Sequence, residues 1–493
     1  MLFGLTLLVH SIFLGQTAVE KWDVFELELQ GKKNGNPFIE VGLKALFYQG
    51  NDTVEVSGFY DGNGQYKIRF MPSKEGLWHY KTFSNQRRVD HKEGRFLCIA
   101  PSGENHGPVV VKDTFYFSYA EGQPFYPLGT TAYGWIQQTQ ETREKTLKSL
   151  KKSPFNKIRV AFLPHAPSGT SYELYPFEGQ GKEWDFTRFN PAYFQRYETY
   201  IRELLKLGIQ VDLFVFHPYD KDVWGFDTMN RKEQYLFLNY INARFGAYRN
   251  IWWSMANEFD LMKNRNMADW DGYFQFFQDK DPYARLRSIH NAAQWYDHSK
   301  DWVTHVSAQS ESWWRSIPLR EQYGKPVIFD EFCYEGNGDN RTVALSGDAI
   351  RHRFWLMTLL GAYATHGEGL EQDGTGYQFF RQGGTFIGSS EGELHTLKKV
   401  LNEVPGHLRP MGTDWRLNHI RAGVDDRYFL YYLGEYQNRE WHFTELPKDK
   451  KYTVELIDTK KGQHTLLDKT FGKDDTVTLP AKPYMAMVLK LSK

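Results

Sequence analysis

Two glutamates, Glu258 and Glu331, each end a nearly apolar stretch of strand length. A buried carboxylate costs several kcal/mol unless it is paired or faces a cavity, so a residue in such a place needs a partner or a task. A pair of capping or salt-bridging side chains is one explanation. Acid–base chemistry is the other, because repulsion between two neighbouring carboxyl groups keeps a proton on one while the other stays ionised. Hydrolysis of an acetal needs both forms, one to protonate the leaving oxygen and one to stabilise the anomeric carbon.

The segments that carry these glutamates belong to a long run of alternating strand and helix patterns. Beyond position 108, apolar runs of strand length alternate with helical stretches such as 141–152, 191–207 and 231–245. Repeated β-α units build a parallel sheet, and eight of them close a TIM barrel whose active site lies at the carboxyl ends of the strands. The two glutamates would therefore share one rim. The eight expected strands are 125–133, 157–163, 210–216, 251–256, 286–290, 302–307, 326–332 and 361–365.

Strand patterns without helices flank this region on both sides. Short runs that alternate apolar and polar residues fill the N-terminal part, with a hairpin signal at 61–64, and predict a β-sandwich. Strand-like runs return after position 411. The sequence thus predicts a multidomain α/β protein, a central (β/α)8 TIM barrel between two β-sandwiches. The expected divisions are a signal peptide at 1–18, an N-terminal β-sandwich at 19–104, the barrel at 105–408 and a small C-terminal β-sandwich at 409–493.

The first 18 residues predict export. An apolar run at 1–15 precedes the small-residue site Gln-Thr-Ala, as in a secretory signal, although no basic residue stands before it. A buried N-terminal segment or a misplaced start codon is the alternative. No second stretch approaches the roughly 20 apolar residues of a membrane helix. The expected location is the periplasm, the cell surface or the extracellular space.

Composition narrows the class of partner. The 493 residues include 60 Lys and Arg and 60 Asp and Glu, so no net charge attracts nucleic acid. Fifteen Trp, 30 Tyr and 36 Phe supply flat side chains that suit the faces of sugar rings as well as protein cores. The 2 cysteines form no C-x-x-C, and no G-x-S-x-G, H-E-x-x-H or Walker-type Gly-Lys-Ser/Thr motif occurs. We therefore predict no metal and no cofactor.

The residues around the two glutamates resemble clan A of the glycoside hydrolases, the family 5-like retaining enzymes. Asn257-Glu258 at the end of the fourth expected strand and Glu331 at the end of the seventh carry the resemblance. Other motifs are similar to cellulase- or endoglucanase-like bacterial hydrolases with a β-sandwich, a barrel and a small C-terminal β-domain. This resemblance implies a fold and a reaction class but no particular sugar. The motifs are GFYDG at 58–62, RFMP at 69–72, NHGPV at 105–109, GTTAY at 129–133, WSMANE at 253–258 and THGE at 365–368.

The resemblance also implies roles for individual residues. Glu258 would be the acid/base and Glu331 the nucleophile of a double displacement, with the two carboxyl groups about 5 to 5.5 Å apart. Asn257 would hydrogen-bond the 2-hydroxyl next to the reacting carbon. Arg159, on the second expected strand, would supply positive charge that keeps Glu331 ionised, with a structural ion pair as its alternative.

Other residues at the expected strand ends would line the same rim. Tyr133 and Trp135, and Trp224 and Trp313 in later loops, could stack on a sugar ring, with core packing as the default alternative. Members of the clan commonly keep a tryptophan at the end of strand eight, whereas this chain has THGEG at 365–369. Each remaining candidate could equally be a satisfied structural group; these candidates are His217, His290, Gln309, His366 and Glu368.

The leading hypothesis is an exported retaining glycoside hydrolase that cleaves β-glycosidic bonds of a polysaccharide or an oligosaccharide. A non-catalytic carbohydrate-binding or adhesion protein is the alternative from another class, and the presence of Glu258, Glu331 and Arg159 argues against it. A transglycosylase on the same barrel would differ only in using a sugar instead of water as the acceptor. The sequence leaves open the sugar, the linkage, endo or exo action and the oligomeric state.

Overall fold

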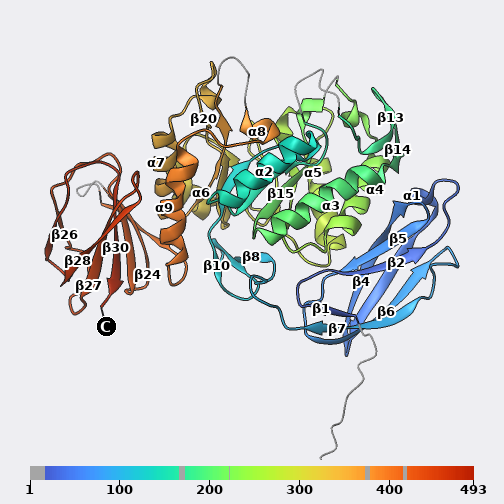
Figure 1. The fold of residues 1–493 in the computed structure, drawn as a ribbon, viewed down its shortest axis with the longest axis horizontal. Helices are drawn as coiled ribbons and strands as arrows, with labels where there is room; N and C mark the ends of the chain where they lie inside the picture. Colours follow the sequence, from blue (N-terminus) through green and yellow to red (C-terminus); the bar gives the residue numbers. More distant parts are fainter. Residues whose placement is uncertain (1–16, 166–171, 221–222, 372–377, 415–418, 493) are drawn as a thin grey trace, which may run out of the picture. The chain divides into compact units, whose positions relative to one another are not determined.

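The chain forms two compact units, which we describe separately (Figure 1). The computed structural model describes residues 17–165, 172–220, 223–371, 378–414 and 419–492. The first unit comprises Met1–Gly107 with Asn239–Arg249, and the second comprises Pro108–Leu238 with Asn250–Lys493. Apart from its last two residues, the expected signal at 1–18 lies outside the described residues. Of the helices in the described ranges, none has both the length and the apolar character of a membrane span.

The first unit contains a β-sandwich whose two layers share one long strand. Its strands are β1 (Ala18–Glu20), β2 (Phe25–Gln30), β3 (Leu43–Gln49), β4 (Asp52–Gly62), β5 (Gln65–Phe70), β6 (Gly76–Ser84) and β7 (Glu93–Ile99), with a short helix α1 (Pro37–Glu40). Strand β4 pairs first with β3 and then with β5, so it passes from one layer to the other. Aromatic rings from the two layers stack between them, Phe25 on Phe96 at 4.1 Å and Phe47 on Phe70 at 4.2 Å between centroids.

The end of one barrel helix groups with this sandwich. Arg244 pairs with Asp61 across 2.6 Å, and the Tyr240 hydroxyl donates to the carbonyl oxygen of Tyr60 at 3.0 Å. The buried Arg69 donates to the carbonyl oxygen of Arg244 at 2.7 Å. Two motifs of the sequence, GFYDG and RFMP, therefore supply structural contacts inside this unit.

The second unit contains the predicted barrel, and the fold class is confirmed. Eight parallel strands lie in the order β17-β16-β15-β12-β11-β21-β19-β18. Each corresponds to an expected segment, because buried apolar runs between helices favour a parallel sheet covered on both faces. Their bounds are β11 (Leu128–Thr131), β12 (Lys157–Ala161), β15 (Gln210–Phe216), β16 (Ile251–Ala256), β17 (Arg287–Ser288), β18 (Val306–Gln309), β19 (Val327–Glu331) and β21 (Tyr363–His366).

The barrel has one weak seam, between its fifth and sixth strands. Strand β17 has only 2 residues and shares no ladder with β18. An isolated β-bridge between His290 and Ser307 and a backbone hydrogen bond from Thr304 N–H to the Arg287 carbonyl at 2.9 Å join the two sides. The Thr304 side chain adds to this seam, because it accepts a hydrogen bond from the backbone N–H of Arg287 at 2.7 Å. The seam matters because His290 also contacts one of the predicted catalytic residues.

Helices begin and end where the sequence signals place them. Asn190 accepts a hydrogen bond from the N–H of Ala192, Pro191 occupies the first turn, and Gly208 follows with φ +70°. The expected helices at 141–152, 191–207 and 231–245 correspond to α2, α3 and α4, whose bounds are given next. The helices are α2 (Gln140–Lys152), α3 (Pro191–Lys206), α4 (Arg231–Phe245), α5 (Met267–Lys280), α6 (Ser316–Tyr323), α7 (Gly347–Leu359), α8 (Phe379–Gln382) and α9 (Ser390–Asn402).

Shorter elements fill the connections of the barrel. A three-stranded sheet precedes the first barrel strand, and a hairpin follows the second. These strands are β8 (Val109–Lys112), β9 (Tyr116–Tyr119), β10 (Pro124–Phe125), β13 (Phe177–Gln180) and β14 (Glu183–Phe189), and two more, β20 (Glu335–Gly336) and β22 (Glu368–Gly369), pair with each other beyond β19 and β21. Single 3-10 turns are η1 (Trp135–Gln137), η2 (Pro218–Asp220), η3 (Phe226–Thr228), η4 (Phe259–Leu261), η5 (Trp313–Arg315) and η6 (Arg341–Val343).

The C-terminal β-domain has apolar residues on both faces of its larger sheet. Its strands are β23 (Arg409–Asp414), β24 (His419–Val424), β25 (Tyr428–Tyr432), β26 (Glu440–His442), β27 (Tyr452–Asp458), β28 (Gln463–Phe471), β29 (Thr476–Thr478) and β30 (Met485–Leu491), with β26 and β29 forming a separate pair. Leu430 shares a core with Trp355 of α7, whereas the neighbouring Phe429 packs with Trp441 of β26. The domain is thus a small sandwich that shares one core with the barrel helices.

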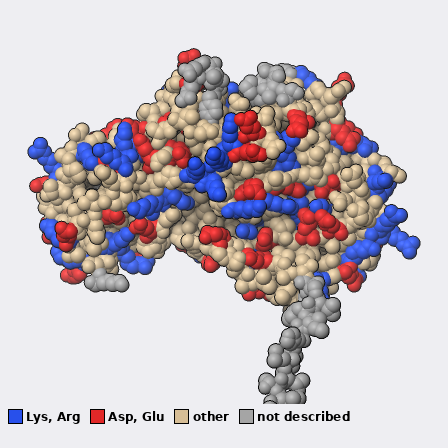
Figure 2. All heavy atoms as spheres, viewed as in Figure 1, with Lys and Arg blue, Asp and Glu red and all other residues tan. Residues whose placement is uncertain are grey.

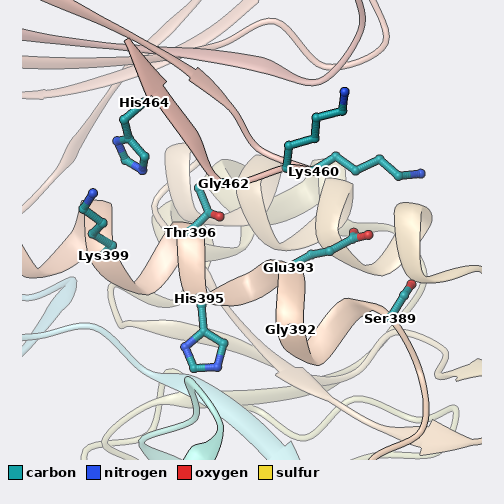
Figure 3. Close-up of a pocket in the computed structure, with 10 residues that line it drawn as sticks. Ser389, Gly392, Glu393, His395, Thr396, Lys399, Lys460, Gly462 and His464 are labelled. Carbon is teal, nitrogen blue, oxygen red and sulfur yellow. The ribbon is translucent and has the colours of Figure 1, made fainter. Parts of the chain in front are cut away.

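A hollow of about 400 Å³ lies where α9 meets the turn between β27 and β28 (Figure 3). Lys460 and His464 extend from that turn and the strand after it, but both have acidic partners: Asp348 at 2.7 Å and Glu455 at 2.9 Å. These acidic partners therefore offset the positive charge that Lys460 and His464 would bring to the hollow. On the face of the molecule drawn in Figure 2, acidic and basic side chains are interspersed.

Candidate active site

Glu258 and Glu331 line one cavity of about 560 Å³ at the carboxyl ends of β16 and β19. Glu258 is the second residue after β16 and has φ +45°, a left-handed conformation that is costly for a residue with a side chain. Gln309, at the end of β18, lies opposite Glu331 after a register shift in the ladder. Irregular backbone of this kind commonly re-aims side chains beside active sites. The two carboxyl groups that sequence analysis singled out therefore face the same space.

Glu331 has three donors or cations around one carboxylate oxygen. The Tyr133 hydroxyl donates to Oε1, His290 Nε2 lies 3.3 Å from it, and Arg159 Nη1 lies 3.7 Å from it. Burial alone would raise the pKa of Glu331, but His290, Arg159 and Tyr133 outweigh it and lower the pKa to about 2. The side chain is only 8% exposed, so this ionised group is held inside the protein and faces the cavity.

Glu258 has the opposite electrostatic character. Its Oε2 accepts a hydrogen bond from the Tyr219 hydroxyl at 2.6 Å. Burial and the negative charge of Glu331 raise its pKa above the usual range, while contacts from Tyr219 and Gln309 act in the other direction. The cavity thus contains one carboxyl group that favours a proton beside one that stays ionised, the division that acid–base catalysis requires.

A buried ionic network stands behind the nucleophile candidate. Lys157 Nζ lies 2.7 Å from carboxylate oxygens of both Asp212 and Asp330, and Arg159 Nε lies 3.5 Å from Asp212. All four side chains have no exposed area. Burial opposes these charges, but the two cations lower the pKa of Asp330, so its carboxyl is ionised. Because the network holds Arg159 from behind, the guanidinium is fixed in place before any ligand binds.

His290 connects this network to Glu331. Ser307 donates its single hydroxyl proton to Asp330 Oδ2 at 2.6 Å, so it must accept from His290 Nδ1, 3.0 Å away. The Nε2 atom of the same ring then faces Glu331. A proton on Nε2 as well would make the ring a cation beside the carboxylate.

Asn257 and Tyr219 form a second chain, which leads to Glu258. Asn257 Oδ1 accepts from Arg159 Nη2 at 2.9 Å, and its Nδ2 donates to the Tyr219 hydroxyl at 2.7 Å. The Tyr219 proton must therefore point to Glu258, which leaves one N–H of Asn257 for another acceptor. Tyr219 lies two residues after His217, and sequence analysis singled out that histidine instead.

The remaining sequence candidates lie in different surroundings. Trp135 has no exposed area and packs edge-on against Tyr200, and Trp224 is buried against Phe226. His217 is buried with its ring stacked on Tyr219, and burial lowers its pKa to about 4. Neither Trp135, Trp224 nor His217 lines the cavity, whereas Tyr133 does.

His366 and Glu368 belong to a separate buried cluster with Glu335. Donor atoms of the three side chains lie within 4.8 Å of one another, a spacing that could hold a metal ion. The two carboxylates, however, accept four consecutive backbone N–H groups: Glu368 those of residues 387 and 388, and Glu335 those of residues 389 and 390. These bonds explain the cluster as an anchor for the start of α9.

Sequence analysis missed much of the cavity wall. These residues come from loops after the strands, where no periodic pattern indicates the direction of a side chain. Burial lowers the pKa of His165 to about 3, so its ring is neutral where it packs edge-on against Tyr133 and Tyr219. The other missed lining residues include Tyr334, Asn340, Thr342, Phe380 and Arg381.

Comparison with known proteins places each part of the chain. Residues 111–370 match the family described as apiosidase-like, catalytic domain. Residues 18–85 match DUF5060 and residues 415–490 match DUF5605, both described as domains of unknown function. No curated protein matches the chain in sequence.

Solved structures show the same architecture. A candidate glycoside hydrolase from Bacteroides vulgatus ATCC 8482 is 37% identical, covers 97% of this chain and 100% of its own, and superposes with a TM-score of 0.91. A family 5 glycoside hydrolase from the same organism is 17% identical, covers 78% of this chain and 93% of its own, and has a TM-score of 0.61. The second likeness concerns the fold alone.

Proposed function

We propose, from the premise that this chain belongs to the apiosidase-like family, that it is a retaining glycoside hydrolase acting on β-linked sugars of a polysaccharide or oligosaccharide. One observation carries the proposal. Glu258 and Glu331 line one cavity, and their pKa values are moved in opposite directions, upward for Glu258 and downward for Glu331. Two carboxyl groups with separated pKa values are the catalytic groups of most glycosidases.

In the first step, the ionised Glu331 attacks the anomeric carbon while Glu258 gives its proton to the leaving oxygen. A covalent glycosyl ester forms on Glu331 and the glycosidic bond breaks. The ester has no negative charge, so the repulsion that raised the pKa of Glu258 is removed at this point. The pKa of Glu258 is therefore lower in the covalent intermediate than in the free enzyme, and Glu258 remains ionised for the next step.

In the second step, Glu258 takes a proton from water, whose oxygen attacks the anomeric carbon and releases Glu331. Glu331 regains its charge, which Arg159 and His290 stabilise from inside the protein. The Tyr133 hydroxyl donates to the same oxygen and keeps the carboxylate oriented in the free enzyme. The second N–H of Asn257, whose side chain has no exposed area in the free protein, would donate to the 2-hydroxyl of the reacting sugar, a contact that strengthens in the transition state.

The test begins with hydrolysis of aryl β-glycosides by the wild type and by Glu331→Gln, Glu331→Ala and Glu258→Ala. We expect wild-type turnover, loss of turnover in both Glu331 variants, and recovery of Glu258→Ala by azide with a β-glycosyl azide product. The matched control is Glu141→Gln, because Glu141 pairs with the exposed Lys145 on α2 and does not line the cavity. Unchanged hydrolysis by either Glu331 variant would remove the assignment.

The product configuration decides the mechanism. A first-formed β-sugar supports double displacement, and an α-sugar means a single displacement with the carboxyl groups farther apart. Binding of glycans by the wild type without turnover would instead support a carbohydrate-binding protein.

A further inference from the structure

The loop after the sixth barrel strand displays an indole to solvent. Trp314 in η5 is 60% exposed, the most exposed tryptophan among the described residues. The ring of Trp313 meets it edge-on with 5.7 Å between centroids, and Trp313 itself packs partly against the barrel core. The exposed ring is therefore supported from behind by a side chain that cannot move freely.

The turn that holds Trp314 is fixed by hydrogen bonds. Arg315 N–H donates to the Ser312 carbonyl at 2.9 Å, and the Ser316 hydroxyl donates to the Trp313 carbonyl at 2.6 Å. The Arg315 guanidinium lies 5.9 Å from the ring of Trp295, on the preceding barrel loop. A rigid ring loses little conformational freedom when a ligand covers it, so this surface is prepared for contact.

The same loop leads directly from the candidate active site. Gln309 acts on the pKa of Glu258, and the N–H of Ser310 donates to the Glu331 carbonyl oxygen at 2.9 Å. Trp314 follows Gln309 by five positions, so their Cα atoms are within ~18 Å of each other. Glu311 also pairs with Arg341 of η6 at 2.7 Å, and both neighbours of that arginine in sequence line the cavity.

The surroundings of Trp314 favour a sugar chain over a protein partner. The single exposed ring shares its loop with Glu311 and Arg315, and Glu311 pairs with Arg341, whose side chain is 83% exposed. Protein interfaces need broad contiguous surfaces of several hundred Å². A sugar residue offers one apolar face for a ring and hydroxyl groups around its edge for charged neighbours.

We propose that Trp314, with Arg315, Glu311 and Arg341, forms a binding subsite for a polysaccharide chain whose reacting end occupies the Glu258–Glu331 cavity. The proposal rests on the proposed function and deepens it, because it assigns a polymer as the substrate class. The indole covers the apolar face of a sugar residue several positions from the cleaved bond, and the flanking side chains bind its hydroxyl groups.

The test measures polymer binding separately from hydrolysis. Glu331→Gln, alone and combined with Trp314→Ala, is run in native gels containing konjac glucomannan, barley β-glucan or birch xylan. We expect at least one polymer to retard Glu331→Gln, and Trp314→Ala to weaken that retardation about threefold to tenfold in apparent Kd. Trp314→Phe should keep most of the affinity. Tyr436→Ala, which removes an exposed aromatic ring from the C-terminal domain, should bind like its parent.

Hydrolysis assays then test the Trp314 subsite separately from the proposed hydrolase function. Trp314→Ala should retain wild-type kcat/KM on an aryl glycoside and an unchanged Tm, since its side chain is on the surface. Equal retardation of the two proteins, or none with all three polymers, overturns the subsite. Failure of the wild type to hydrolyse aryl glycosides, with a Trp314-dependent retardation intact, would instead overturn the proposed function and leave the subsite standing.

Discussion

Two clusters at the barrel rim each contain two glutamates and a histidine. In the first, Glu258 and Glu331 lie near His290, and in the second, Glu335 and Glu368 lie near His366. Each has one carboxyl whose pKa is raised, with burial as the largest cause, and one whose pKa is lowered to about 2 against the effect of burial. A perturbed pKa therefore does not separate a reactive cluster from a structural one in this protein.

The hydrogen-bond donors do separate them. Glu258 and Glu331 are held by side chains, Tyr219 and Tyr133 among them, and the carboxyl groups still face a cavity. Glu335 and Glu368 accept the backbone N–H groups of residues 387–390, and Glu335 also accepts from the hydroxyl groups of Ser389 and Ser390 in the same segment. A carboxylate that anchors backbone cannot change its partners without moving the chain, whereas one held by hydroxyl groups can gain or lose a proton and keep its place.

The largest effect that could break this comparison is on activity. Glu331→Gln removes the proposed nucleophile, and we expect kcat on an aryl β-glycoside to fall about 10,000-fold or more. Glu335→Gln should leave kcat near the wild-type value, because Glu335 bonds to the start of α9 and does not line the cavity. Steady-state assays of both purified variants check this, and similar losses in the two would erase the distinction.

The next effect concerns the donor to the nucleophile. The Tyr133 hydroxyl helps to lower the pKa of Glu331, so Tyr133→Phe should raise that pKa and move the acid limb of kcat/KM to higher pH. We expect kcat/KM to fall about 10-fold to 100-fold, as for loss of a hydrogen bond to a charged group. The pH profile of kcat/KM is the measurement, and an unmoved acid limb would contradict the assigned role.

A smaller effect tests the action of Tyr219 on Glu258. Tyr219 acts to lower the pKa of Glu258, so Tyr219→Phe should raise it and shift the basic limb of the pH profile to higher pH. The control is Tyr334→Phe, whose hydroxyl lies 3.1 Å from that of Tyr133 and serves the nucleophile side instead. A basic limb that moves equally in both variants would show that Tyr219 has no specific action on Glu258.

The smallest effect is on stability and tests the structural cluster. A glutamine at 335 has one acceptor oxygen where the carboxylate has two, so Glu335→Gln should cost about 1 to 3 kcal/mol of unfolding free energy at neutral pH. The folded pKa of Glu335 is about 2, below its ordinary 4.5, so its contribution is complete above pH 4.5 and is lost as pH falls toward 2. Urea unfolding at pH 7 and pH 3 should show the variant and wild type converging at the lower pH.

Sequence patterns located the barrel and its two central carboxyl groups for a simple reason. An apolar strand that ends in Glu258 or Glu331 must bring that residue to the rim, wherever the loops go. The same reasoning placed His366 and Glu368 at the rim, but their partners at 387–390 follow in a later loop, and strand periodicity contains no information about them.

Loop residues escaped the analysis because their side-chain directions depend on turns. Tyr219 reaches Glu258 from η2, a 3-10 turn that begins at Pro218, and no apolar period marks it. The fifth strand is shorter than expected because side-chain bonds such as that of Thr304 to Arg287 replace part of its ladder. Short elements of this kind depend on distant partners, which a local pattern does not specify.

The isolated β-bridge at the seam of the barrel joins His290 and Ser307, the same two residues that link Asp330 to Glu331. The seam with the fewest strand-to-strand hydrogen bonds is therefore also the place where the buried ionic network reaches the proposed nucleophile. Mild heating that separates His290 from Ser307 would abolish activity while the other barrel strands are still paired. We therefore expect activity to be lost at a lower temperature than the Tm of global unfolding.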